Sequence, residues 1–162
     1  ALARLDRPGV ELVLVGGRGW IYEEIFARVA ALGLTSRVRF AGYVDDEELP
    51  LWYNAAAVLA FPSFYEGFGM PVADALACGT PVVAAATSSI PEAGGDVALY
   101  FEPRNADELA ERLRQALDDP EVRRNTRAVG PTHAARFSWA RSGTEMAAVY
   151  HRAAAEPARS AA

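Results

Sequence analysis

The chain has 162 residues, of which 51% are hydrophobic and 23% charged, a composition typical of one soluble globular domain. A formal net charge of −5 disfavours a broad nucleic-acid-binding face, so no nucleic-acid partner is expected. All 16 basic residues are arginines, which excludes any mechanism within this chain that depends on a lysine.

The first half of the chain alternates apolar runs with helical patterns. Residues 11–16 predict a buried strand, and residues 22–33 repeat apolar side chains at helical spacing before ending in a glycine. Residues 37–44 predict a second strand. Either Asp45 or Asp46 can cap the short helix expected at residues 48–56, whose length is limited by Pro50.

The second half continues the alternation. Strands are predicted at residues 57–62, 80–86 and 97–103, and helices at 70–79, 106–119, 121–136 and 139–155. Pro71 suits the first turn of a helix, and Gly79 suits its end. Asn105 and Ser138 are expected to cap the helices that follow them. Trp139 is interpreted as a packing residue.

This order of elements indicates an α/β fold. Continuously apolar strands separated by helices predict a Rossmann-like open, mostly parallel sheet with helices on both faces. The opening stretch ALARLDRPGV resembles the end of a helix and its exit loop, so we expect the sheet to lack its first βα unit. Residues 157–162 are expected to form a disordered tail.

The single cysteine bears on the cellular compartment. Cys78 cannot form an internal disulfide, which fits a reducing environment. The N-terminus carries no signal-peptide pattern, and the longest apolar stretches are too short to cross a bilayer. A cytoplasmic location is therefore expected.

The stretch FPSFYEGFGMPVADALACGTPVV, residues 61–83, contains the residues that indicate a ligand-binding site most clearly. It places Glu66 beside two glycines at the carboxyl end of a predicted strand, directly before a predicted helix that contains Asp74. The carboxyl ends of parallel strands are where ligands bind in open sheets, and a helix N-terminus favours an anion such as pyrophosphate. Two carboxylates beside a phosphate site suit a ligand of the form sugar–phosphate–ribose.

The same stretch is similar to the nucleotide-sugar-binding motif of family 4 (group 1) retaining glycosyltransferases, which have the GT-B fold. Further similarity lies in LVLVGG, VRFAGYV, LPLWYNAA, SSIPEAGGDVALYFEP and FSW, so it extends over nearly the whole chain. The resemblance implies that residues 1–156 form a single donor-binding domain, a fragment of a two-domain protein. The N-terminal acceptor domain, and the Arg and Lys that clamp the pyrophosphate, are then missing.

The resemblance also implies roles for individual residues. Glu66 matches the acid at the catalytic centre that contacts donor sugar hydroxyls. Asp74 stands where the family has a ribose-binding Glu, with the charge kept on a shorter side chain. The remaining donor-binding residues that match the family are Gly16, Gly17, Tyr43, Val44, Gly67, Phe68, Gly69 and Met70.

The activity implied by the resemblance is sugar transfer, with mannose or rhamnose favoured, from a nucleotide diphosphate sugar to an acceptor hydroxyl. GDP- or UDP-sugar is the expected substrate, with no cofactor and no metal, and the fragment is expected to be inactive alone. A peripheral membrane contact through the missing part is allowed. Two alternatives stay open: a non-catalytic nucleotide- or sugar-binding or interaction module, and a fragment of a nucleotide-sugar epimerase.

Overall fold

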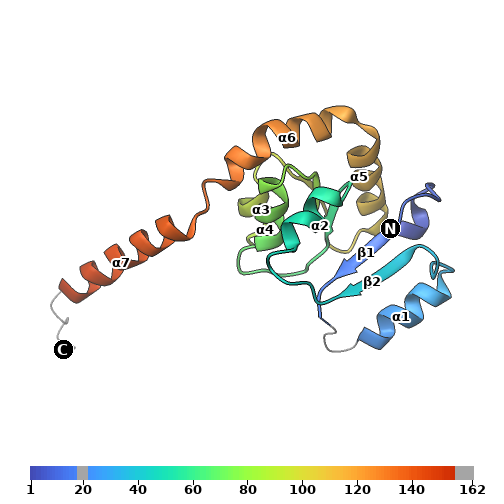
Figure 1. The fold of residues 1–162 in the computed structure, drawn as a ribbon, viewed down its shortest axis with the longest axis horizontal. Helices are drawn as coiled ribbons and strands as arrows, with labels where there is room; N and C mark the ends of the chain where they lie inside the picture. Colours follow the sequence, from blue (N-terminus) through green and yellow to red (C-terminus); the bar gives the residue numbers. More distant parts are fainter. Residues whose placement is uncertain (18–21, 156–162) are drawn as a thin grey trace.

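The computed structural model describes residues 1–17 and 22–155, and the predicted tail lies outside this part. Helices and strands alternate along most of the chain (Figure 1). The elements are η1 (Leu2–Arg4), β1 (Leu12–Val15), α1 (Tyr22–Ala31), β2 (Val38–Gly42), α2 (Leu49–Ala55), β3 (Leu59–Phe61), α3 (Met70–Ala77), β4 (Val82–Ala85), α4 (Ile90–Gly94), β5 (Leu99–Phe101), α5 (Ala106–Asp118), α6 (Pro120–Ala134) and α7 (Trp139–Ala155).

All described strand pairs are parallel, which confirms the α/β class with open sheets and flanking helices. The strands form two sheets rather than the single sheet expected. One has the order β1-β2 and the other β3-β4-β5. Within the described residues, the second edge of β1 and the second edge of β3 carry no strand partner. The absence of a first βα unit stays a prediction.

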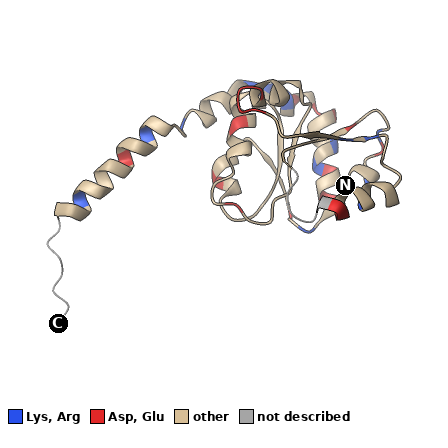
Figure 2. Cartoon of the chain, turned by 60° about the horizontal axis from the view of Figure 1, so that its bottom comes forward, with Lys and Arg blue, Asp and Glu red and all other residues tan. Residues whose placement is uncertain are grey.

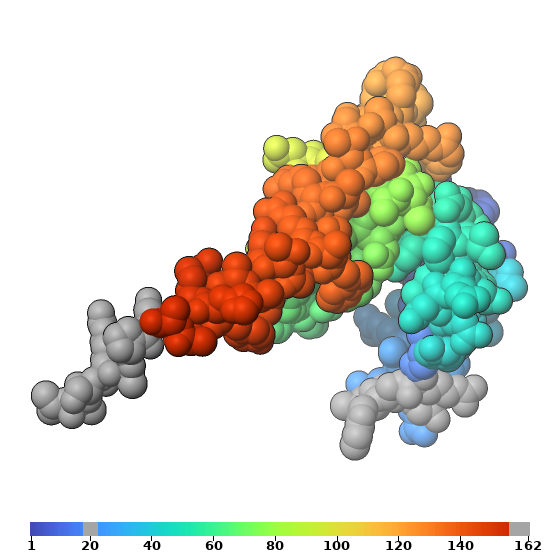
Figure 3. Space-filling model, turned by 60° about the vertical axis from the view of Figure 1, so that its left-hand side comes forward, coloured from blue at the N-terminus to red at the C-terminus, as the bar shows by residue number. Residues whose placement is uncertain are grey.

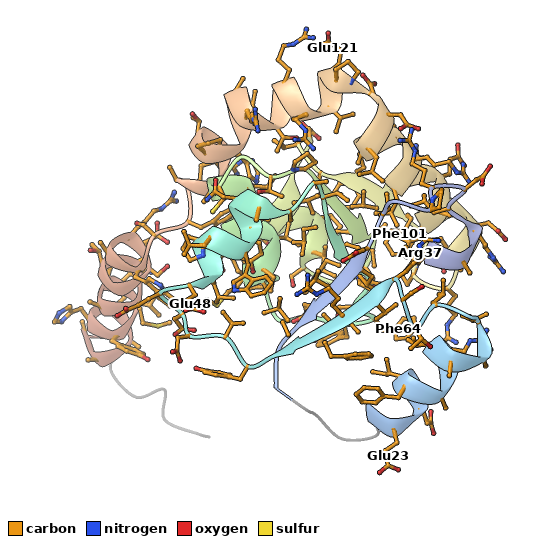
Figure 4. The ribbon with its side chains drawn as sticks, turned by 45° about the vertical axis from the view of Figure 1, so that its right-hand side comes forward. Glu23, Arg37, Glu48, Phe64, Phe101 and Glu121 are labelled. Carbon is orange, nitrogen blue, oxygen red and sulfur yellow. The ribbon has the colours of Figure 1, made fainter. Side chains whose placement is uncertain are left out.

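The hydrophobic core lies around β4. Every residue of this strand is buried, because helices α3, α4 and α5 all pack against it. Figure 4 shows Phe101, at the end of β5, in the middle of the molecule, whereas Glu23 and Glu121 lie at its periphery. The expectation that both sheet faces are covered is wrong for β1, where Val13 and Val15 remain exposed.

Several predicted helix ends are confirmed. The Asn105 side chain accepts hydrogen bonds from the backbone N–H groups of Asp107 and Glu108, at 3.2 and 3.0 Å. Ser138 Oγ accepts one from the N–H of Arg141 at 3.2 Å. Gly79 follows the end of α3 with φ +70°, a conformation that glycine adopts without a steric penalty.

The predicted cap of the helix at residues 49–55 is wrong. Glu48 occupies the N-cap position, and no side chain accepts a hydrogen bond there. The backbone oxygen of Asp45 instead accepts from the N–H groups of Glu48 and Leu49, at 2.9 and 3.3 Å. A backbone turn therefore starts this helix, and neither the Asp45 nor the Asp46 carboxylate is used.

The last helix leaves the body of the molecule. Figures 1 and 3 show α7 extending outward from the end of α6, and none of its residues is buried. Trp139 is 81% exposed, so its interpretation as a packing residue is wrong. Basic and acidic residues alternate along α7 (Figure 2), from Arg141 to Glu145 to Arg152. No described helix is both long enough and apolar enough to cross a bilayer.

Candidate functional site

The loop between β3 and α3 carries a row of unused backbone donors. The N–H groups of Gly67, Phe68, Gly69 and Met70 donate to no acceptor within the described part of the chain. Gly69 is the N-cap of α3 and has φ +101°, a left-handed conformation that a residue with a Cβ rarely adopts. Pro71 in the first turn has no N–H to leave unpaired. Together with the helix dipole, four consecutive unpaired donors make a cradle for an anion.

A hydroxyl-rich turn after β4 holds this loop in place. The Glu66 N–H donates to Ser88 Oγ at 3.0 Å, and Ser89 Oγ donates to the Glu66 carbonyl at 2.8 Å. Thr87 Oγ1 donates to the Phe64 carbonyl at 3.3 Å. Among the described residues other than glycine, only Ser88 has a positive φ, at +47°. Such a conformation costs on the order of 1 kcal/mol or more, and here it lets Ser88 reach Glu66.

The two predicted acids keep unpaired carboxylates. Glu66 is half-buried and Asp74 exposed, and neither carboxylate has a hydrogen-bond or ion-pair partner within the described residues. Although Asp74 is exposed, the protein beside it removes part of its water and raises the pKa of its carboxyl above 3.8. Burial, and secondarily the charge of Asp74, raise the pKa of Tyr53 to about 12. Tyr53, on α2, is therefore close enough to Asp74 for its charge to act on the tyrosine hydroxyl.

The side chains of the loop divide between solvent and core. Phe68 is half-buried, and its ring meets Phe137 edge to face with the ring centroids 5.0 Å apart. Met70 is about half exposed. The Phe68 ring is partly used in this packing, and a contact of its backbone with a ligand stays a prediction.

The other predicted donor-binding residues follow β1 and β2. Gly16 has φ +139° and donates its N–H to the Gly42 carbonyl at 2.8 Å, so these two strand ends lie side by side. Tyr43 is 74% exposed, whereas the Val44 side chain is buried. A contact between Val44 and a base would therefore use its backbone. Gly17 is exposed. No hydrogen bond among the described residues joins this group to the Glu66 loop.

The predicted site omitted Ser88 and Ser89. A signal for them exists, because three consecutive hydroxyl residues follow β4, the strand that pairs with β3. In parallel sheets, loops that leave neighbouring strands at their carboxyl ends meet each other.

An open apolar hollow lies elsewhere and does not overlap this site. It measures about 450 Å³ and is lined by residues of η1, α1, β1 and β2, together with Leu32 and Leu34. Leu12 and Val38, which line it, are the first residues of their strands, so the hollow opens toward the amino ends. Ligands of open parallel sheets bind at the opposite ends. Among the described residues, no group of three or more His, Cys, Asp or Glu could hold a metal ion.

Comparison with known proteins places the chain in a family. The family described as "Glycosyl transferases group 1" matches residues 1–133. The O-antigen chain mannosyltransferase B of Escherichia coli is 38% identical over 139 residues, which cover 86% of this chain and 36% of that protein. The D-inositol 3-phosphate glycosyltransferase of Jonesia denitrificans is 36% identical over 152 residues, covering 91% of this chain and 36% of that protein.

Comparison with solved structures supports the same family assignment. The sucrose-phosphate synthase of Thermosynechococcus elongatus superposes with a TM-score of 0.84 at 32% identity, covering 95% of this chain and 41% of that one. Anabaena HepE in complex with UDP gives a TM-score of 0.79 at 26% identity, covering 93% of this chain and 43% of that one. The chain thus spans little more than a third of the length of these curated relatives. It belongs to the group 1 glycosyltransferases and has the fold of a GT-B domain.

Proposed function

We propose that this chain is the donor-binding half of a retaining, family 4 glycosyltransferase. It binds a nucleotide diphosphate sugar, in which the sugar is linked to UDP or GDP. The sugar is then transferred to a hydroxyl group of an acceptor molecule, which a second domain binds. The single observation that carries this proposal is the loop at residues 66–70, where four unpaired N–H groups lie next to an unpaired carboxylate. The relatives' names, which include mannosyltransferases, favour mannose as the sugar.

The geometry suits the charge that develops during transfer. When the bond between sugar and diphosphate breaks, negative charge grows on the diphosphate while the sugar becomes cationic. The N–H groups of residues 67–70 and the α3 dipole are fixed in advance, so they stabilise that charge without reorganisation. Glu66 orients the sugar by accepting hydrogen bonds from its hydroxyls, and Asp74 accepts from the ribose. The acceptor and its binding groups belong to the rest of the protein.

A titration series tests the proposal. The chain is titrated with UDP, GDP, UDP-glucose and GDP-mannose by calorimetry or NMR, with a Kd of about 1 mM expected for the preferred donor. Glu66→Ala removes hydrogen bonds to a charged acceptor, each worth about 1.5–3 kcal/mol. We therefore expect about tenfold or more weakening for the sugar nucleotide and little change for the bare nucleotide.

Glu111→Ala is the matched control. Glu111 is an exposed carboxylate on α5, and no hydrogen bond or ion pair holds it within the described residues. Its loss changes the net charge equally and should leave all four affinities unaltered. Equal weakening of nucleotide and sugar nucleotide by Glu66→Ala would contradict the placement of Glu66 on the sugar. Absence of binding by every probe would contradict the donor-binding function.

A further inference from the structure

The junction between α6 and α7 contains a motif that the proposed function leaves unused, the stretch FSW at residues 137–139. We propose that His133, in the last turn of α6, and Phe137, just after the end of this helix, are positioning residues that hold the donor loop, residues 66–70, in its binding conformation. The inference rests on the proposed function for what the loop binds. It also makes a claim about the loop itself that can be measured without any ligand.

Phe137 reaches the donor loop directly. Its ring packs edge to face against the Phe68 ring, with 73° between the ring planes. Such an aromatic pair contributes stability beyond that of the apolar area it buries. Phe68 lies between two glycines, Gly67 and Gly69, which offer no side chain to restrain the backbone. Its anchored ring therefore adds to the hydrogen bonds of Ser88 and Ser89 in fixing the direction of the neighbouring N–H groups.

His133 reaches the same loop through α4. It is buried, and its Nε2 lies 2.9 Å from the Ala93 carbonyl. Because a carbonyl can only accept, Nε2 carries the proton and donates to it, and Nδ1 is left to accept from the Arg136 guanidinium at 3.4 Å. The ring also fills the space beside Gly95, where a Cβ would lie 2.4 Å from the imidazole Cε1. The C-terminal end of α4 is thus fixed to α6.

The opposite end of α4 holds Glu66. Ser89 is the N-cap of this five-residue helix, and its hydroxyl donates to the Glu66 carbonyl. In between, the Ala93 Cβ lies 3.5 Å from the point where a Cβ on Gly69 would sit, so the loop passes close to the helix here. A shift of α4 at His133 therefore reaches the loop at both Glu66 and Gly69.

The test measures the order of the loop separately from overall stability. Amide hydrogen exchange of Glu66, whose N–H is bonded to Ser88 Oγ, is followed by NMR for the whole 162-residue chain. Loss of the aromatic pair in Phe137→Ala should speed this exchange by about 3–10-fold and raise the Kd for the preferred nucleotide sugar similarly. Phe137→Tyr, which keeps the ring, should restore both. Phe137→Leu replaces the alanine variant if the latter does not fold, with an intermediate effect expected.

Leu113→Ala is the control for mere loss of packing. Leu113 is a partly buried residue of α5 that packs against the same core. Among the described residues, no hydrogen bond joins α5 to the donor loop. It should lower the unfolding midpoint and leave Glu66 exchange within about twofold of the wild type under native conditions. The proposal is overturned if Phe137→Ala leaves Glu66 exchange unchanged, or if Leu113→Ala accelerates it equally. If the wild type binds no probe, the donor-binding function fails, but the exchange result still decides the positioning role.

Discussion

Replacing Gly130 with alanine tests whether α6 is pressed directly against α3. In an ordinary helix interior this change is stabilising by about 0.5–1 kcal/mol, because alanine loses less conformational freedom. At Gly130 the added Cβ would lie 2.7 Å from the backbone oxygen of Leu76 in α3. A backbone atom cannot rotate away, so α6 would have to move by several tenths of an ångström. Overpacking of this kind costs about 1–3 kcal/mol, and we expect a net loss of about 1–2 kcal/mol.

The change in stability is measured by thermal or urea unfolding. Each kcal/mol shifts the thermal midpoint by roughly 2–4 °C in a chain of this size. Gly143→Ala is the matched substitution, because Gly143 lies inside α7 and a Cβ added there would meet nothing within 4 Å. It should leave the midpoint unchanged or raise it. An increase in stability for Gly130→Ala would refute the close approach of the two helices, and with it the support that α6 gives to α3.

Two further predictions concern a charge and a cap. Burial raises the pKa of the Asp74 carboxyl, so the folded chain holds the carboxyl proton more tightly than the unfolded chain does. Ionisation of Asp74 therefore lowers the free energy of unfolding as the pH rises from 3.8 through the raised pKa. Asp74→Asn should therefore unfold at higher urea than the wild type near neutral pH, with the difference vanishing below pH 3.8, in a series of urea titrations. Asn105→Ala removes the acceptor of two N–H groups at the start of α5 and should cost about 1 kcal/mol in the same assay, whereas Asn105→Asp should retain most of it.

Features that depend on a few neighbouring residues could be predicted from the sequence. The caps by Asn105 and Ser138 need only one side chain and the helix turn that follows it. The end of α3 at Gly79 likewise follows from the tolerance of glycine for positive φ. Apolar runs identified the strands because parallel strands bury both faces, and β4 meets that condition fully.

Features that depend on the rest of the chain could not be predicted in the same way. Both Asp45 and Asp46 are good capping residues, yet the backbone of Asp45 supplies the acceptor instead. An apolar pattern does not tell which strand edges and faces stay open, so the division into two sheets and the exposure of Val13 were missed. Trp139 has the size of a core residue, but no residue of α7 is buried against the described part of the chain.

In the candidate site, too, the residues of one local motif could be predicted, whereas those that the fold brings from elsewhere could not. Glu66, Asp74 and the glycines between them form one continuous motif, and the structure keeps them in one loop and helix. The groups that hold the loop come from elsewhere, Ser88 being 22 residues away from Glu66 in sequence. Phe137 lies farther still along the chain, after both α5 and α6. Local spacing contains no information about such contacts, although the hydroxyl run after β4 offers a hint.

The distribution of unpaired groups is itself a reason to place a ligand here. Within the described residues, no buried side-chain nitrogen or oxygen lacks a hydrogen-bond partner. At the loop between β3 and α3, by contrast, four N–H groups and the Glu66 carboxylate go without partners, and Ser88 adopts a strained conformation to hold them there. Unlike the start of α5, which Asn105 caps, the start of α3 lies beside an unpaired carboxylate. Unpaired donors and an unpaired carboxylate side by side suit a molecule that carries both an anion and hydroxyl groups, which is what the proposed function requires.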